Sequence, residues 1–344
     1  ETVEHESVTY TVTAIGSNAF SDHTGRKTLT IPKSVTFIAP RAFYNCVSLA
    51  SIHVDGDNTA YIDADGILFD KNKTSLVKYP AGKTSSVYAV PDDVKSIGDY
   101  AFESCKNLTA VTLPDSVTSI GVRGFDSCIN LVAMAIPEGV TSIGDSAFSG
   151  WAALASIVIP EGVKSIGDLA FSSCTSLASI AIPEGIQSIG DSAFSRCTSL
   201  ASIVIPEGVT SIKSEAFSGC TALESIVIPE SVTFIGNFVF YGCTALASIV
   251  LPEGVQSIGN DAFDNISADA KVLAVFNEAP DANKEINLKI TYALTGDHIR
   301  WYRGFRTFSS SAGPVVLTLE QNKEYDLKAI LGITDTVYKG ETGS

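Results

Sequence analysis

The chain has 344 residues, a formal net charge of −15 at pH 7 and an isoelectric point near 4.6, and 45% of its residues are hydrophobic. This acidic balance excludes sequence-independent nucleic-acid binding, which needs Lys and Arg to neutralise phosphates, and it disfavours an anionic membrane surface. No apolar run approaches the roughly 18 residues of a spanning helix, so no membrane-spanning segment is expected in this chain.

A 23-residue repeat organises most of the chain. Each copy opens with a proline, an isoleucine follows six residues later, and a phenylalanine follows eleven residues later. The regularly spaced prolines are Pro91, Pro114, Pro137, Pro160, Pro183, Pro206, Pro229 and Pro252, and Pro32 opens an earlier copy. A repeat of this length indicates units that bury their apolar side only by stacking on their neighbours. The phenylalanine and isoleucine columns are therefore expected to form the core.

Within one copy, apolar residues alternate with small ones before the proline, which is the pattern of a strand. The proline is expected to end this strand as the second residue of a type I turn. Residues 163–166 form a second short extended piece, after which Gly167 turns the chain and Asp168 is expected to cap a short helical turn that carries Phe171. Each coil is thus predicted as strand, turn, strand and helical turn.

The repeat Leu-x-x-Ile-x-Ile-Pro-x-x-Val-x-x-Ile-Gly-x-x-Ala-Phe-x-x-Cys closely resembles the BspA-like leucine-rich repeats of bacterial surface proteins. One copy reads in full from Leu177 to Cys197, with Ile186 at the valine position, and the resemblance covers about residues 12–263. The asparagine ladder of the more familiar leucine-rich repeat has no counterpart here. The predicted fold is a repeat solenoid, a β-rich right-handed superhelix with parallel strands and short helical turns, followed by a small antiparallel β domain.

Two regions depart from the repeat. Between Pro32 and Pro91 the chain holds 36 residues beyond one coil, and segments 61–69 and 75–80 suggest an inserted hairpin and a shortened coil. After Phe263 the period ends, and alternating segments at 271–276, 285–293, 299–308, 315–319 and 325–331 suggest antiparallel strands. The expected domains are therefore a solenoid over 1–264, irregular at about 55–90, and a small β-sandwich-like domain over 265–344.

The seven cysteines stand at one offset of the repeat, where Trp151 replaces the cysteine of one coil. They are Cys46, Cys105, Cys128, Cys174, Cys197, Cys220 and Cys243. Stacked Cβ vectors run parallel, which is poor geometry for a disulfide, so buried free thiols that behave as small apolar residues are expected. Disulfide bridging or metal capture is the alternative.

No catalytic or metal-binding motif is recognisable, so no catalytic residue, metal ligand or cofactor is predicted. The four histidines, His5, His23, His53 and His298, have no metal-ligand spacing. One acidic row, from Glu138 to Glu253, follows the prolines and is read either as solvated turn residues or as a cation-collecting row. The acidic residues at 55, 57, 63 and 65 suggest calcium only weakly, because the EF-hand spacing is missing.

Two surfaces are candidates for binding. The outward strand positions are small or weakly apolar, and their exposure would mark a partner surface, although β-branched residues also simply favour strands. The binding residues predicted there are Val158, Val204, Val227 and Val250. A second cluster at 298–306 contains Arg300 and Tyr302, which suit a glycan or an anionic partner, with core packing as the alternative.

The resemblance implies a non-enzymatic, secreted or surface-anchored binding protein, similar to adhesins, located outside the cell or on its surface. Its expected partner is a host or neighbouring-cell extracellular protein or glycan. The alternative function is a structural spacer that displays other domains, which the near-identical outward residues of the central coils favour. Because the chain opens at Glu1, any targeting segment is expected to lie outside it.

Overall fold

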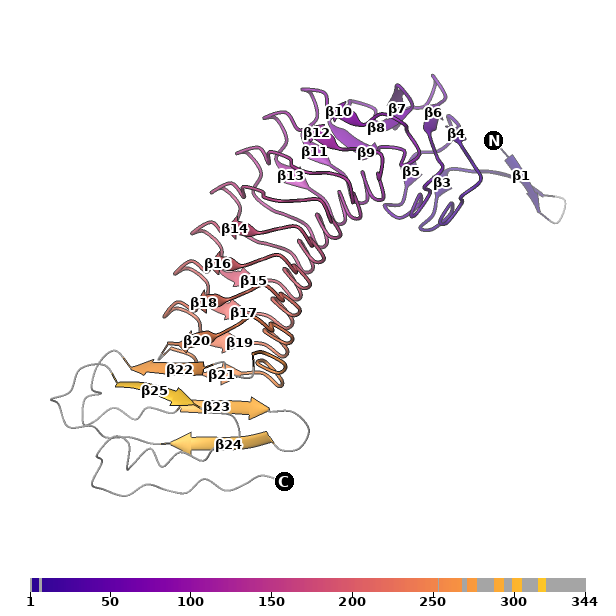
Figure 1. The fold of residues 1–344 in the computed structure, drawn as a ribbon. Coiled ribbons are helices and arrows are strands. Elements are labelled where there is room, and N and C mark those ends of the chain that lie inside the picture. The colour runs from indigo at the N-terminus through magenta and orange to yellow at the C-terminus, as the bar shows by residue number, and fades with distance from the viewer. Residues whose placement is uncertain are drawn as a thin grey trace. The chain divides into compact units, whose positions relative to one another are not determined.

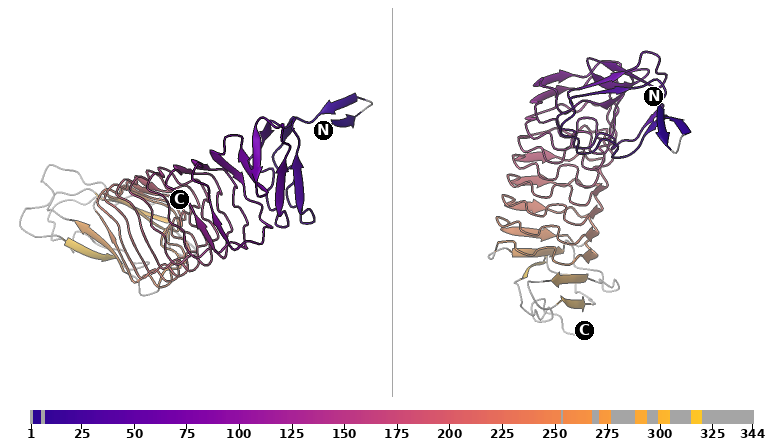
Figure 2. Two further views of the ribbon diagram at one scale, coloured as in Figure 1. Left: turned by 90° about the horizontal axis from the view of Figure 1, so that it is seen from above. Right: turned by 90° about the vertical axis from the view of Figure 1, so that its right-hand side faces the viewer.

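The computed structural model describes residues 2–5, 8–252, 254–267, 271–276, 288–293, 299–304 and 315–319; side chains are described for 9–247, 249–252 and 254–267. The chain divides into two compact units, Glu1–Leu177 and Ala178–Ser344. Within each unit, successive coils stack so that equivalent strands lie side by side (Figures 1 and 2). Each unit is a parallel β-solenoid, as the repeat predicts.

The first unit contains thirteen strands among its described residues. They are β1 Thr2–His5, β2 Val8–Thr11, β3 Ala14–Ile15, β4 Thr28–Ile31, β5 Phe37–Ile38, β6 Ser51–Val54, β7 Tyr61–Ala64, β8 Ile67–Asp70, β9 Ser75–Lys78, β10 Val87–Ala89, β11 Ser96–Ile97, β12 Ala110–Thr112 and β13 Ser119–Ile120. Parallel pairs join β3 to β5, β4 to β6, β10 to β12 and β11 to β13. The repeated coil thus supplies two ladders, one from each of its two short strands.

The insertion of the first unit is a hairpin followed by a shortened coil, as the sequence predicts. Strands β7 and β8 pair antiparallel, and β8 pairs antiparallel with β9 through an irregular register. Strand β9 then pairs parallel with β11, placing Leu76 beside Ile97. The parallel ladder therefore continues from the shortened coil into the regular repeats.

The second unit contains twelve described strands. They are β14 Ser179–Ala181, β15 Ser188–Ile189, β16 Ser202–Val204, β17 Ser211–Ile212, β18 Ser225–Val227, β19 Phe234–Ile235, β20 Ser248–Leu251, β21 Ser257–Ile258, β22 Lys271–Phe276, β23 Leu288–Ala293, β24 Ile299–Gly304 and β25 Val315–Leu319. Strands β14, β16, β18, β20 and β22 form one parallel series, and β15, β17, β19 and β21 form another.

The predicted C-terminal domain falls mainly outside the described residues. Its described backbone includes antiparallel pairs between β22 and β25 and between β23 and β24. Strand β22 also pairs parallel with β20, so it extends the ladder of the repeats. The sandwich-like arrangement over 265–344 stays a prediction.

The phenylalanine column forms a stack of parallel rings in the core of each unit. In the second unit the ring of Phe217 stacks on Phe194 at 5.6 Å and on Phe240 at 5.7 Å between centroids, with interplanar angles of 4° and 5°. The side chain of Phe217 is fully buried. In the shortened coil of the first unit, Tyr79 takes the corresponding place and stacks on Phe102 at 5.2 Å. One buried ring per coil thus holds neighbouring coils together.

The predicted helical turns are wrong, because no described segment of the chain is a helix. Segment 167–174 instead forms successive β-turns, in which the amides of Ala170 and Ser172 donate to the carbonyls of Gly167 and Leu169. The carbonyls of Ala170 and Ser172 accept amides from the coil before, at 2.9 and 2.8 Å. Leu169 also has φ of 59°, a left-handed conformation that an α-helix does not contain. Hydrogen bonds between coils replace those of a helix.

The predicted helix cap and proline turn also differ from the structure. The carboxylate of Asp145 accepts the amide of Asp168 one coil further on, at 2.9 Å, so this acidic row links coils. In the proline turn, the carbonyl of Pro160 accepts the amide of Val163 at 3.0 Å. Proline is therefore the first residue of the turn rather than the second.

Candidate functional site

The outward side chains of β14, β16 and β18 form a ladder of small and apolar residues on the second unit. Ala181 pairs with Val204, and Val204 pairs with Val227, across adjacent parallel strands. Val204 is 75% exposed and Val227 is 70% exposed, whereas Ile203 between the outward positions of β16 is buried. The period of two along each strand thus places isoleucine in the core and valine in solvent. We call Ala181, Val204, Val227 and Val250 the valine ladder.

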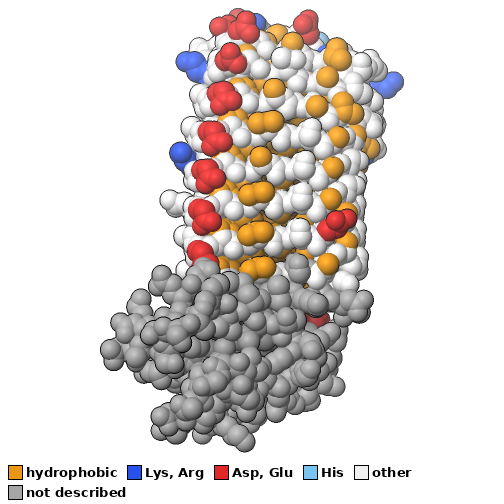
Figure 3. Space-filling view, turned by 60° about the vertical axis from the view of Figure 1, so that its left-hand side comes forward, with side chains coloured by type: hydrophobic (Ala, Val, Ile, Leu, Met, Phe, Trp, Pro, Cys, Tyr) orange, Lys and Arg blue, Asp and Glu red, His pale blue; other side chains and the backbone are white. Residues whose placement is uncertain are grey.

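A row of exposed glutamates follows the valine ladder, one at each proline turn. Its described members in the second unit are Glu184, Glu207 and Glu230. Figure 3 shows acidic side chains following one another beside rows of hydrophobic side chains. Among the described residues, no group of three or more His, Cys, Asp or Glu side chains could hold a metal ion.

The other predicted binding residues have different positions. Val158 is 75% exposed in the first unit, which agrees with its predicted outward position. Val250 pairs with Val227 but is half-buried. Arg300 and Tyr302 lie in β24, whose backbone is described, but their side chains lie outside the described part of the chain. The structure thus brings Val204, Val227 and Val250 into one ladder.

The cysteine column is structural, and its side chains are free, buried thiols. The thiol of Cys220 donates to the carbonyl of Phe194 at 3.1 Å, and the thiol of Cys243 donates to the carbonyl of Phe217 at 3.1 Å. In the coil without cysteine, the indole Nε1 of Trp151 donates to the carbonyl of Phe125 at 2.6 Å. Burial raises the pKa of Cys243 to about 12. The column thus supplies a hydrogen-bond donor as well as apolar bulk.

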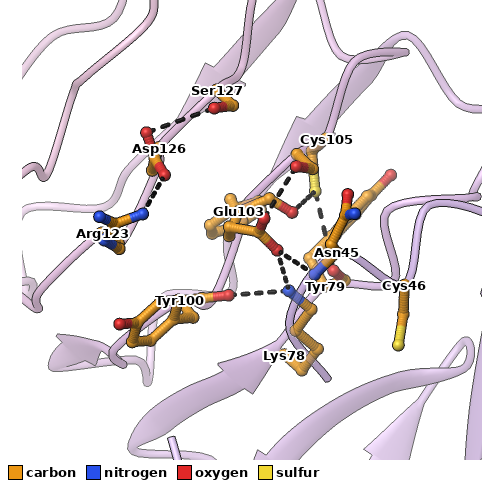
Figure 4. A network of polar contacts seen from close by, with 12 residues as sticks. Asn45, Cys46, Lys78, Tyr79, Tyr100, Glu103, Cys105, Arg123, Asp126 and Ser127 are labelled. Atoms are coloured by element: carbon orange, nitrogen blue, oxygen red, sulfur yellow. Dashed lines mark hydrogen bonds and ion pairs between the residues drawn. The ribbon is translucent and has the colours of Figure 1, made fainter. Parts of the chain in front are cut away.

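A buried polar network lies where the shortened coil interrupts the repeat of the first unit (Figure 4). Nζ of Lys78 lies 3.6 Å from Oε2 of Glu103, and both side chains are 3% exposed. Lys78 also donates to the carbonyl of Tyr100 at 2.9 Å. The carboxylate of Glu103 accepts the amide of Asn45 at 3.2 Å and the hydroxyl of Ser104 at 2.8 Å. Glu103 therefore reaches across the shortened coil to the coil of Asn45, while Lys78 pairs with it from the shortened coil itself.

A second ion pair stands beside this network. Nη1 of Arg123 lies 3.1 Å from Oδ2 of Asp126. Burial raises the pKa of Asp126, and the Arg123 guanidinium opposes that rise. Because the buried groups pair with one another, their contacts link neighbouring coils as a structural network.

A single coil of the second unit carries a group of exposed aromatic residues that the repeat pattern did not predict. Phe234, Phe238 and Tyr241 are 42%, 37% and 40% exposed. The sequence does contain a signal for this group, because the three aromatic residues depart from the repeat. The equivalent positions one coil earlier hold Ser211, Glu215 and Ser218.

These features define the chain as a protein built on leucine-rich-repeat solenoid units. It matches the family described as BspA type leucine rich repeat region, in six copies over residues 2–73, 83–183 and 164–274. Because these matches cover most of the chain, the chain belongs to the BspA-type leucine-rich-repeat family. In the part of the chain that the structure describes, no helix is long and apolar enough to cross a bilayer.

Several solved structures are similar to this chain. A leucine-rich repeat protein from Eubacterium ventriosum is 34% identical, with a TM-score of 0.62, over 67% of this chain and 62% of that chain. The pneumococcal vaccine antigen PcpA is 27% identical, with a TM-score of 0.47, over 61% of this chain and 51% of that chain. A leucine rich cell surface protein from Faecalibacterium prausnitzii is 26% identical, with a TM-score of 0.46, over 86% of both chains. No curated protein matches this chain.

Proposed function

We propose that this chain is a non-enzymatic binding protein, secreted or held on the cell surface, that recognises an extracellular protein or glycan in the manner of an adhesin. The exposure of Val204 and Val227 carries this proposal. Two adjacent β-branched side chains that are at least 70% exposed present apolar surface which a partner would remove from water. The chain belongs to a repeat family whose sequence resembles bacterial surface proteins, and this membership supports a location outside the cell or on its surface.

The valine ladder suits recognition of a flat partner surface. Its rungs are fixed by backbone pairing, so Val204 and Val227 are held in register without the loss of freedom that ordering a loop would require. The serines at the other outward positions of these strands, Ser202 and Ser225, offer hydroxyl groups beside the apolar rungs. This mixture of fixed apolar and small polar groups fits the centre and rim of a protein interface.

The test is a pair of charge substitutions on the ladder with a matched control. The variant V204E/V227E is expected to lose capture of a partner from a panel of extracellular-matrix proteins and glycans, because a carboxylate would be buried without a counter-ion. The control T210E/T233E adds the same charge at exposed positions of the same two coils. It is expected to bind like the unmodified chain. Both variants are expected to keep its thermal stability, since all four positions are exposed.

A structural spacer is the alternative function. The identical outward serines of successive strands, Ser179, Ser202 and Ser225, favour it, because a repeated small residue offers no individual recognition. Absence of binding across the whole panel would support the spacer, whereas binding that V204E/V227E leaves unchanged would remove the ladder from the proposal. We also propose that the chain catalyses no reaction. Turnover that a point substitution abolishes would contradict this.

A further inference from the structure

One coil of the second unit presents aromatic side chains where the neighbouring coils present polar ones. Phe238 takes the position held by Glu215 one coil before and by Asp261 one coil after. Tyr241 takes the position of Ser218, and both rings are more than a third exposed. These two residues of one coil form a compact aromatic pair among positions that are polar in the other coils of the second unit.

The backbone at Phe238 gives a reason to assign this pair a role outside the fold. Phe238 has φ of 56°, in the left-handed region, which costs a residue with a Cβ about 1–2 kcal/mol. The same left-handed position holds Ser192, with φ of 54°, and Glu215, with φ of 58°. In the second unit the other coils hold Ser192, Glu215 and Asp261 at this position, while Leu169 and Tyr100 hold it in the first unit, so neither the turn nor the core requires phenylalanine.

The pair is held in a defined geometry. The amide of Tyr241 donates to the carbonyl of Phe238 at 3.1 Å, and this turn brings the two rings together. Their centroids lie 5.9 Å apart at an interplanar angle of 79°, an edge-to-face arrangement. Such an arrangement leaves part of a ring face open to a ligand while the partner ring supports it.

Acidic residues occupy the position equivalent to Phe238 in the coils before and after it. The amide of Glu215 donates to the carbonyl of Asn237 at 2.8 Å, and the amide of Phe238 donates to the carbonyl of Asn260 at 2.9 Å. These bonds place Glu215 and Asp261 in the coils directly before and after Phe238. An aromatic face attracts a cation through its quadrupole, and a carboxylate adds a direct attraction to the same charge.

We propose that Phe238 and Tyr241, with Glu215 and Asp261, bind a lysine or arginine side chain in a basic segment of a partner protein. The net charge of −15 draws a basic segment toward the chain and repels an acidic one. A neutral glycan would use the rings and could donate its hydroxyls to the carboxylates, but it would gain no net charge attraction from them. This site is separate from the valine ladder and stands independently of the binding role proposed for it.

The test measures binding of an acetylated and amidated (Gly-Lys)3 peptide by calorimetry in physiological salt, which screens long-range attraction. The variant F238S/Y241S changes no charge and is expected to weaken binding about 3- to 30-fold, the range of one or more cation–π contacts. The variant E215Q/D261N is also expected to weaken it. The control F37S, which removes an exposed phenylalanine of the first unit, is expected to leave affinity unchanged. The ladder variant V204E/V227E is likewise expected to retain peptide binding.

Two further measurements complete the test. The same peptide with every lysine side chain acetylated is expected not to bind, and the variant F238S is expected to melt at or above the temperature of the unmodified chain. Absence of binding by the unmodified chain, equal affinity of F238S/Y241S, or equal binding of the acetylated peptide would each overturn the proposal. Aromatic-dependent binding of a neutral oligosaccharide without lysine-peptide binding would overturn it in favour of a glycan site.

Discussion

Lys78 and Glu103 are nearly inaccessible to solvent, and their charged atoms lie 3.6 Å apart, so replacement of Lys78 by Met is a direct test of the buried network in the first unit. At an effective dielectric constant of about 20, two unit charges at that distance attract each other by roughly 5 kcal/mol. Removing the ammonium leaves the Glu103 carboxylate buried without a counter-ion. The expected loss of unfolding free energy is about 3–5 kcal/mol.

The double variant K78M/E103Q separates the charge from the hydrogen bonds. A glutamine oxygen can still accept the amide of Asn45, so the double variant is expected to recover at least half of the stability that K78M loses. The comparison variant R123M breaks an ion pair whose arginine is 36% exposed, and it is expected to cost about 1 kcal/mol.

The measurements are chemical denaturation and hydrogen exchange of the segment that contains Asn45. Local exchange is informative because repeat arrays do not always unfold in one step. If K78M cost less than about 1 kcal/mol, or if the losses of K78M and E103Q simply added, the charges would not be coupled and our interpretation of the network would be wrong.

Four other predictions concern the repeated columns. Phe217→Ala should lower the unfolding free energy by about 3–5 kcal/mol in denaturation, because the ring is fully buried between two others, and a loss below 1 kcal/mol would contradict the stacked core. All seven thiols should resist a thiol reagent at pH 8 in the native protein and react on unfolding. Because burial raises the folded pKa of Cys243 from a usual value near 9.0 to about 12, its stabilising contribution should be present below pH 9 and lost as pH rises toward 12. Gly219→Ala should cost about 1 kcal/mol from its φ of 72° alone, since the nearest atom to an added Cβ lies at 3.5 Å, and a larger loss would indicate a clash.

The repeat period alone predicted the two strand ladders, the ring stack and the outward position of the valines. These features depend on which residue types recur at fixed offsets, and a strict period of 23 places equivalent residues such as Ile203 and Ile226 in direct register. The cysteines were expected to act as small apolar residues. Their hydrogen bonds to phenylalanine carbonyls were not expected, because a donor's acceptor in another coil is visible only in three dimensions.

The helical turns were predicted wrongly because the sequence of a short turn does not show where its amides will find acceptors. Left-handed residues such as Leu169 and Ser173 carry no strong local signal, although Gly150 in the column of Ser173 does. The stacking of coils favoured β-turns over a helical turn, because β-turns let amides of one coil donate to carbonyls of the next.

The sequence by itself determined the repeating core, since burial of identical apolar positions requires only that copies stack. Tertiary structure alone decided which residues from unequal coils meet. The shortened coil brings Glu103 to the amide of Asn45. Such contacts depend on the path of the backbone between coils, which a column of aligned residues does not encode.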